Sequence, residues 1–154
     1  FSCVIMPING IITGEPYALS MHSGLLRELA NNREAAPCPW SEEAYRQFRQ
    51  FLCDHFEIPD ILPTVVGKNF ASFDMRFLKK DEYLSQIIPC FHHRILDVGS
   101  LYFEPGKDRC IPSTEECLRR AGLPVEVKHD ALSDAIQTAE LVCAYYAKQQ
   151  QKEG

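Results

Sequence analysis

A histidine and an aspartate five positions apart, His129 and Asp134, are the residues of this sequence best suited to chemistry. Apolar residues follow them at helical spacing, at Ala135, Leu141 and Tyr145. We therefore expect Asp134 in the first turns of a helix and His129 on the loop that enters it. An imidazole and a carboxylate arranged in this way suit a general base beside a metal ligand. The alternative is a solvent-facing histidine and an aspartate favoured by the helix dipole, and this stretch alone does not decide between them.

A second stretch combines a predicted turn with another carboxylate. The β-branched run at residues 64–66 breaks at Gly67, and a helical spacing of apolar residues begins at Phe70. This pattern predicts a short strand, a turn at Asn69, and a helix that carries Asp74 in its first part. The two stretches would then present two carboxylates, one imidazole and one amide from elements far apart in the chain.

Together the two stretches resemble the second and third motifs of DnaQ-like 3′→5′ exonucleases, in the DEDDh branch that includes proofreading exonucleases and oligoribonucleases. The resemblance covers about residues 64–142 and is carried by Gly67-x-Asn69-x-x-x-Phe73-Asp74 and His129-x-Ala131-x-x-Asp134-Ala135. It implies an α/β domain of RNase H-like fold, with a mixed β-sheet flanked by helices. It also implies an enzyme that releases nucleoside monophosphates from the 3′ ends of single-stranded DNA or RNA, with Mg²⁺ or Mn²⁺ as cofactor.

The resemblance assigns a role to each candidate residue. Asp74 and Asp134 correspond to metal-binding carboxylates, and His129 corresponds to the general base that deprotonates the attacking water. Asn69 corresponds to the second-motif asparagine, which is expected to position substrate or the local backbone. Phe70, beside it, is a substrate-binding candidate because its ring could stack on a base. Two ions are expected in the intact family site, because cleavage of a phosphodiester by two metals needs several carboxylates in a small volume. An imidazole has an unperturbed pKa suited to proton abstraction near neutrality.

The first motif of the family, an Asp-x-Glu pair on the central strand, is absent. The first acidic residue is Glu15, and no aspartate stands two positions before it. Residues 1–6 resemble the strand that follows the missing one, so we expect a chain truncated at its amino end that lacks two of four metal-binding carboxylates. A divergent member whose sheet closes differently is the alternative. Whether this chain cleaves nucleic acid is left open, and unpaired strand edges would favour a homodimer.

Two further functions stay open beside the exonuclease. One is a noncatalytic nucleic-acid-binding or interaction module on the same fold, which would bind a strand without metal-dependent cleavage. The other is an unrelated metal-dependent hydrolase, which would need a carboxylate or histidine cluster that the sequence does not display beyond the two motifs. A zinc site would have to come from Cys90, His92, His93, Cys110 and Cys117. Their spacing matches no common ligand pattern.

Basic and aromatic side chains near the second motif are candidates for contacts with nucleic acid. Phe70 and Phe73 could stack on bases, but the helical spacing predicts that Phe73 lies in the core. Basic residues flank the same region at Lys68, Arg76, Lys79 and Lys80. They could contact the phosphates of a nucleic acid, but the favoured interpretation is that they form an ordinary solvated helix face.

The composition is that of one ordinary domain. A length of 154 residues predicts a single domain, 1–154, and the formal net charge of −5 argues against a protein that coats nucleic acid nonspecifically. Seven cysteines, an odd number, favour buried thiols and a reducing compartment. No apolar run approaches the length of a membrane span, so we expect a cytoplasmic protein without membrane contact.

Local signals predict several further elements. A capping box at Ser113 and Glu116, with Gly122 as terminator, predicts a helix over residues 114–121. A helix with an apolar stripe is predicted to begin at Ser41. Other expectations are a helix over 83–88 ended by proline, a strand over 94–98 with Asp97 near its end, and a frayed tail over 148–154.

Overall fold

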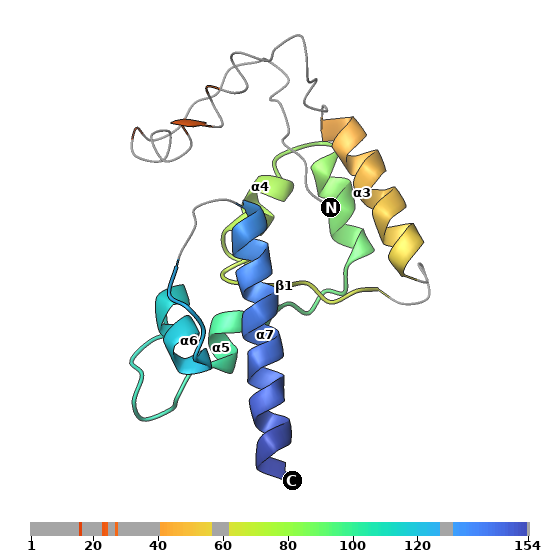
Figure 1. Cartoon of the computed structure of the whole chain (residues 1–154). Coiled ribbons are helices and arrows are strands. Elements are labelled where there is room, and N and C mark those ends of the chain that lie inside the picture. Colours follow the sequence, from red (N-terminus) through yellow and green to blue (C-terminus); the bar gives the residue numbers. More distant parts are fainter. Residues whose placement is uncertain are drawn as a thin grey trace. The chain divides into compact units, whose positions relative to one another are not determined.

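The computed structural model describes residues 41–56, 62–126 and 131–153, together with the isolated positions 16, 23, 24 and 27. The chain divides into two compact units (Figure 1). In the first unit the described residues are 41–56 and 78–88, and in the second they are 62–77, 89–126 and 131–153. The strand expected at residues 1–6 and the predicted general base, His129, lie outside the described residues.

Helix α3 (Ser41–His55) belongs to the first unit and begins where the sequence predicted it. Glu42 and Glu43 occupy its first turn, where carboxylates interact favourably with the helix dipole. Ala44 and Leu52, both on the predicted apolar stripe, are buried. The prediction of an amphipathic helix is therefore confirmed.

The 3₁₀ helix η1 (Leu84–Cys90) lies where an α-helix ending before proline was expected. The Oδ1 atom of Asp81 accepts hydrogen bonds from the backbone N–H groups of Tyr83 and Leu84, both at 2.9 Å, and so starts the segment. Pro89 lies inside the helix, so the predicted end was wrong. A 3₁₀ helix bonds to the third preceding residue, which avoids the clash of a proline ring with the fourth preceding carbonyl of an α-helix.

The strands of the second unit, β1 (Val66–Gly67) and β2 (Leu96–Asp97), pair in parallel. Val66 lies opposite Leu96 and Gly67 opposite Asp97. β2 falls inside the predicted range 94–98, whereas β1 extends one residue past the predicted run to include Gly67, and each strand has only two residues. The part of the chain that the structure describes is mostly helical, with this two-stranded sheet, and it is α/β only in the broad sense.

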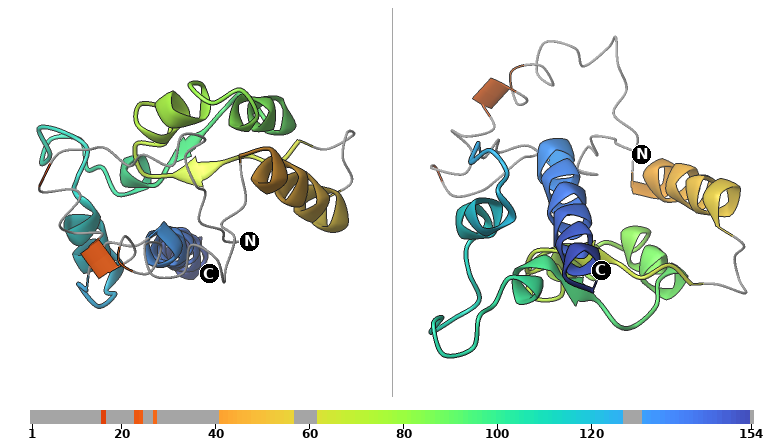
Figure 2. Two further views of the ribbon diagram at one scale, coloured as in Figure 1. Left: turned by 90° about the horizontal axis from the view of Figure 1, so that it is seen from above. Right: turned by 60° about the horizontal axis from the view of Figure 1, so that its bottom comes forward.

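Among the described residues, the second unit also contains α5 (Val98–Leu101), α6 (Thr114–Ala121), α7 (Ala131–Glu153) and all but the last residue of α4 (Asp74–Leu78) (Figure 2). Both ends of α6 follow the sequence prediction. The hydroxyl of Ser113 accepts a hydrogen bond from the N–H of Glu116 at 3.2 Å. Gly122 ends the helix in the left-handed conformation, with φ of 79°, which glycine adopts without a Cβ penalty.

The core of the second unit lies between α5, α6 and α7. Its buried side chains are Val98, Tyr102, Cys117, Leu118, Ala121 and Leu141. Burial of this apolar surface is the main favourable contribution to the stability of the unit. The long helix α7 therefore depends on packing against α5 and α6 for its position.

Helix α7 continues to Glu153, so the described part of the tail predicted to fray is helical. The ammonium of Lys148 donates a 2.7 Å hydrogen bond to the backbone carbonyl of Arg120 in α6. This contact holds the last turns of α7 against the end of α6, where a cation also compensates the carbonyls of a helix terminus. Among the described residues no helix, α7 included, is long and apolar enough to cross a membrane.

Candidate active site

A single cleft of the second unit is lined by Asp74, Asp134, Asn69 and Phe70, which are four of the five candidate site residues. Its volume is about 600 Å³, within the range of small-ligand sites. The fifth candidate, His129, lies outside the described residues. The structure thus brings together the carboxylates of the two sequence motifs, which are sixty residues apart (134 − 74).

The two carboxylates reach the cleft from different elements. Asp74 is the first residue of α4, which follows the strand β1 through a turn, and it is half-buried. Asp134 is exposed and lies in the first turn of α7, whose residues contact β1. A carboxylate in the first turn also stabilises a helix through its dipole, so both residues have a structural as well as a chemical reason for their positions.

The turn between β1 and α4 requires particular residues at two positions. Asn69 has a φ of 58°, a left-handed conformation that asparagine tolerates better than most residues. Its carbonyl accepts hydrogen bonds from the N–H groups of Ser72 at 3.0 Å and Phe73 at 2.8 Å. A Cβ atom at Gly67 would lie 2.9 Å from the Cβ of Phe70, so no side chain fits there without movement of the turn. Both requirements agree with the predicted strand, turn and helix.

Asp97, at the end of β2, is a residue of this region to which the sequence assigned no role. Its Oδ2 accepts a 2.7 Å hydrogen bond from the backbone N–H of Asn69. Its Oδ1 accepts from the N–H of Gly99 at 2.9 Å and of Ser100 at 3.3 Å, so Asp97 is also the N-cap of α5. An aspartate at the end of a predicted strand was visible in the sequence, but its partner 28 residues away was not.

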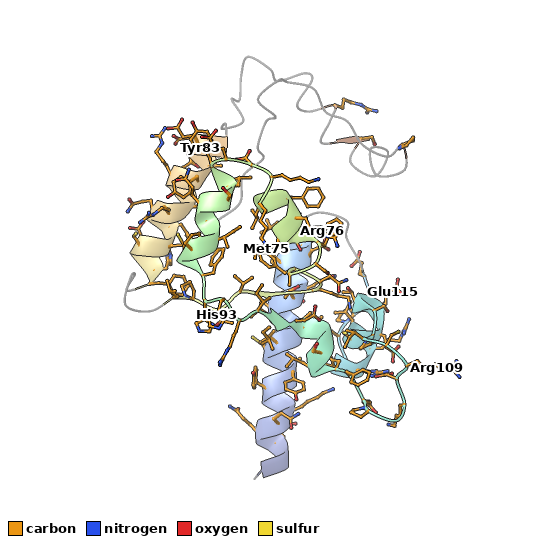
Figure 3. All side chains as sticks on the ribbon, turned by 180° about the vertical axis from the view of Figure 1, so that it is seen from behind. Met75, Arg76, Tyr83, His93, Arg109 and Glu115 are labelled. Atoms are coloured by element: carbon orange, nitrogen blue, oxygen red, sulfur yellow. The ribbon has the colours of Figure 1, made fainter. Side chains whose placement is uncertain are left out.

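The four basic residues that flank the second motif in the sequence differ in their surroundings. Lys68 lines the cleft, is half-buried, and donates a 2.5 Å hydrogen bond to the carbonyl of Pro112. The prediction of a solvated face was therefore wrong for Lys68. Arg76, Lys79 and Lys80 are exposed, as that prediction required. Figure 3 shows Arg76 beside Met75 on the short helix α4.

Phe73 lines the cleft and is 61% exposed, so its prediction as a core residue was wrong. The residues from Phe70 to Phe73 form a turn, and the helix starts only at Asp74, so the apolar spacing does not describe one continuous helix face. Phe77 is 58% exposed, and its ring lies edge-on to that of Phe73 with centroids 5.1 Å apart. The cleft therefore has an accessible aromatic side chain beside its two carboxylates.

The donors of the cleft suit a divalent cation only in part. Within residues 41–56, 62–126 and 131–153, no three histidine, cysteine or acidic side chains are grouped so that they could hold a metal ion. Asp74 and Asp134 supply two carboxylates to one cleft. Mg²⁺ is commonly held by one or two carboxylates together with water and phosphate oxygens. The described residues therefore supply two carboxylates of the expected metal site, and they do not test how many ions it would hold.

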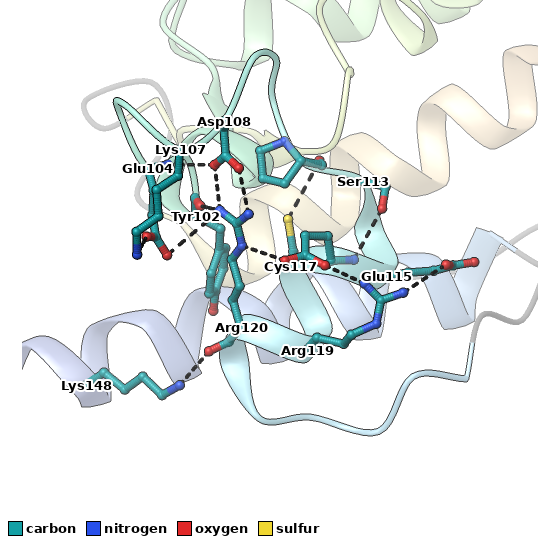
Figure 4. Close-up of polar contacts among 12 residues, drawn as sticks. Tyr102, Glu104, Lys107, Asp108, Ser113, Glu115, Cys117, Arg119, Arg120 and Lys148 are labelled. Atoms are coloured by element: carbon teal, nitrogen blue, oxygen red, sulfur yellow. Dashed lines mark hydrogen bonds and ion pairs between the residues drawn. The ribbon is translucent and has the colours of Figure 1, made fainter.

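The strongest charge cluster of the second unit surrounds Arg120 on α6 (Figure 4). The guanidinium donates to both carboxylate oxygens of Asp108, at 2.6 and 2.7 Å, and to Glu116 at 2.9 Å. It also donates to the backbone carbonyl of Tyr102 at 2.7 Å. These contacts join α6 to Tyr102 and to Asp108 in the preceding segment, so we assign the cluster to stability. Its side chains do not line the cleft.

No known protein family matches the chain, and no curated protein matches it either. Two observations point to the function of this protein. One is the pair of sequence motifs that resemble DEDDh exonucleases, and the other is the cleft in which the described residues of both motifs meet.

Proposed function

We propose that this protein is a divalent-metal-dependent 3′→5′ exonuclease of the DEDDh type, on an RNase H-like fold, that acts on single-stranded DNA or RNA. The observation that carries the proposal is the cleft lined by both Asp74 and Asp134. Asn69 and Phe70 line the same cleft, so the substrate-binding candidates lie beside the metal-binding candidates. Two unrelated surface aspartates would have no reason to share a cleft with the remaining residues of one motif.

The position of the cleft in the sheet also supports the proposal. β1 and β2 are parallel, and the residues that follow β1, Lys68 and Asn69, line the cleft. In α/β proteins, ligands bind outside the carboxyl ends of parallel strands, where loops can converge without disturbing the sheet. A site for a reacting strand end is therefore reasonable at this edge.

Each cleft residue has a proposed role. Asp74 and Asp134 would hold Mg²⁺ or Mn²⁺, which neutralises phosphate charge and lowers the pKa of bound water. The amide side chain of Asn69 would bind the substrate by hydrogen bonds, and the ring of Phe70 would stack on a base. We retain His129 as the proposed proton acceptor from the water that attacks the phosphodiester.

The test is digestion of 5′-labelled single-stranded DNA and RNA oligonucleotides with Mn²⁺. The proposal expects a ladder that shortens by one nucleotide from the 3′ end and that disappears with EDTA. Asp74→Asn and Asp134→Asn should abolish the ladder, because each removes a charged metal ligand while keeping the side-chain shape. Glu140→Gln is the matched control, since it removes an exposed carboxylate of α7 that does not line the cleft. Absence of cleavage both by the wild-type protein and by a variant with an Asp-x-Glu strand added ahead of residue 1 would refute the exonuclease.

A noncatalytic nucleic-acid-binding module is the second candidate, and the exposure of Phe73 in the cleft favours it. Stacking of a base on an aromatic ring needs no metal ion. This function expects oligonucleotide binding in EDTA, measured by fluorescence anisotropy, and no cleavage in Mn²⁺. The cytoplasmic location and the homodimer stay predictions from the sequence. Light scattering would test whether the protein is a dimer.

A further inference from the structure

We infer that Asp97 is a positioning residue for the cleft, because it holds the backbone of Asn69 and thereby directs the asparagine side chain toward substrate. The contact is a 2.7 Å hydrogen bond from the N–H of Asn69 to Oδ2 of Asp97. The effect on substrate binding rests on the proposed exonuclease function. The effect of Asp97 on the conformation of the turn does not depend on that function.

The parallel register explains how Asp97 reaches Asn69. Asp97 lies opposite Gly67 in the sheet, and Asn69 follows Gly67 by two residues. Both strands end at the same edge, so the carboxylate at the end of β2 lies next to the turn that leaves β1. A hydrogen bond to a charged acceptor is stronger than one between neutral groups, so this carboxylate is well suited to hold the turn.

Hydrogen bonds fix both the N–H group and the carbonyl group of Asn69, whose backbone is in the left-handed conformation. Its N–H donates to Asp97, and its carbonyl accepts from Ser72 and Phe73. A φ of 58° is unfavourable for a residue with a Cβ, so the conformation needs such contacts to persist. The Asn69 side chain is exposed and lines the cleft, so fixing the backbone also limits where the amide can reach.

The surroundings of Asp97 leave little room for another arrangement. A Cβ atom at Gly99 would lie 3.0 Å from Oδ1 of Asp97 and 3.2 Å from Nζ of Lys68. It would also lie 2.6 Å from Cγ2 of Ile111. Gly99 is buried, and its missing side chain lets the carboxylate and the ammonium approach the start of α5. The Asp97 carboxylate is therefore confined between α5 and the Asn69 turn.

One substitution can separate the two roles of Asp97, which are to cap the N-terminus of α5 and to accept a hydrogen bond from the Asn69 turn. An aspartate offers acceptor oxygens on both sides, whereas an asparagine has one carbonyl oxygen and one NH₂ group, which only donates. Asparagine is as good an N-cap as aspartate. In Asp97→Asn the carbonyl can still cap α5 while the NH₂ group faces the N–H of Asn69, so the turn loses its acceptor and the helix keeps its cap.

The experiment combines amide hydrogen exchange with steady-state kinetics on the full chain. In Asp97→Asn we expect the Asn69 amide to exchange at least about tenfold faster, since a charged acceptor is lost. We expect KM for the oligonucleotide to rise by about tenfold or more while kcat changes less, because Asn69 is assigned to substrate binding. Ser113→Ala is the control, because it removes the N-cap of α6 and should lower stability without raising KM.

A double-mutant cycle tests whether Asp97 acts through Asn69. If it does, Asp97→Asn should add little to the KM of Asn69→Ala, whereas independent effects would multiply. Multiplied effects would overturn the inference, and so would an unchanged exchange rate of the Asn69 amide in Asp97→Asn. Absence of cleavage both by the wild-type protein and by a variant with an added Asp-x-Glu strand would refute the proposed exonuclease. The exchange measurement would still decide whether Asp97 holds the turn.

Discussion

The hydroxyl of Tyr102 donates a 2.6 Å hydrogen bond to the backbone carbonyl of Leu141. Tyr102 is the C-cap of α5, and Leu141 lies within α7, so the bond joins the segment after β2 to the helix that carries Asp134. Both residues are buried. Burial raises the pKa of Tyr102, so its hydroxyl stays a proton donor over the ordinary pH range. The position of α7 beside the cleft depends in part on this contact.

Tyr102→Phe should lower the free energy of unfolding by about 1 kcal/mol, because it removes a buried hydrogen bond and keeps the ring packing. Urea denaturation monitored by circular dichroism would measure the change. Tyr146→Phe is the matched control, since it removes a tyrosine hydroxyl from α7 at a side chain that is 51% exposed. Equal effects of the two substitutions would contradict the importance of the bond to Leu141.

Phe73→Leu should weaken binding of single-stranded oligonucleotides by about tenfold, because a base would lose its stacking partner in the cleft. Phe77→Leu is the natural comparison. Phe77 is 58% exposed against 61% for Phe73, but it does not line the cleft. Fluorescence anisotropy in EDTA would measure both dissociation constants without cleavage. Equal losses of affinity would show that the bases do not use the cleft.

Asp108 should make folding stability depend on pH in the acid range. Hydrogen bonds from Arg120 lower the pKa of Asp108 from an ordinary 3.8 to about 2. A carboxyl group with a lowered pKa in the folded state stabilises the protein above its ordinary pKa. We therefore expect stability to fall as the pH decreases from about 4 to about 2. Unfolding by urea at several pH values would follow this loss.

Asp108→Asn should make that acid-range loss smaller, and it should also lower stability at neutral pH, because Arg120 loses its bidentate partner. Arg120 also lowers the pKa of Glu116, so some dependence on pH should persist in the variant. Glu115→Gln is the control, because it removes an exposed carboxylate of α6 whose ion pair, at 3.5 Å, is with Arg119 and not with Arg120. If both variants kept the wild-type slope, Asp108 would not be the titrating group.

Gly122→Ala should destabilise the protein by about 1 kcal/mol, because alanine is strained at a φ of 79°. No atom outside the neighbouring residues lies within 4 Å of a Cβ placed there, so the cost would come from the backbone conformation and not from a clash. Gly122→Asn should cost less, since asparagine tolerates this region. Thermal unfolding of both variants would compare them, and equal costs would argue against backbone strain as the cause.

The elements of this protein that were predictable from the sequence are those set by neighbouring residues. Ser113 and Gly122 mark the two ends of α6 within one short segment, and the break at Gly67 marks the turn before α4. Caps and turns use hydrogen bonds between residues a few positions apart, so their signals stand next to each other in the chain. Asp74 and Asp134 were likewise predicted as candidate site residues because each stands in a motif of neighbouring residues.

Tertiary structure alone decided which distant groups meet. Asp97 bonds to Asn69 across 28 positions, Lys68 to Pro112 across 44, and Tyr102 to Leu141 across 39. These partners depend on the register of β1 against β2 and on the packing of α7, which no local pattern encodes. The exposure of Phe73 was decided in the same way, because burial depends on what packs over a side chain. The sequence by itself therefore determined the candidate carboxylates and the local turns, and only the packing of distant segments brought those carboxylates into one cleft.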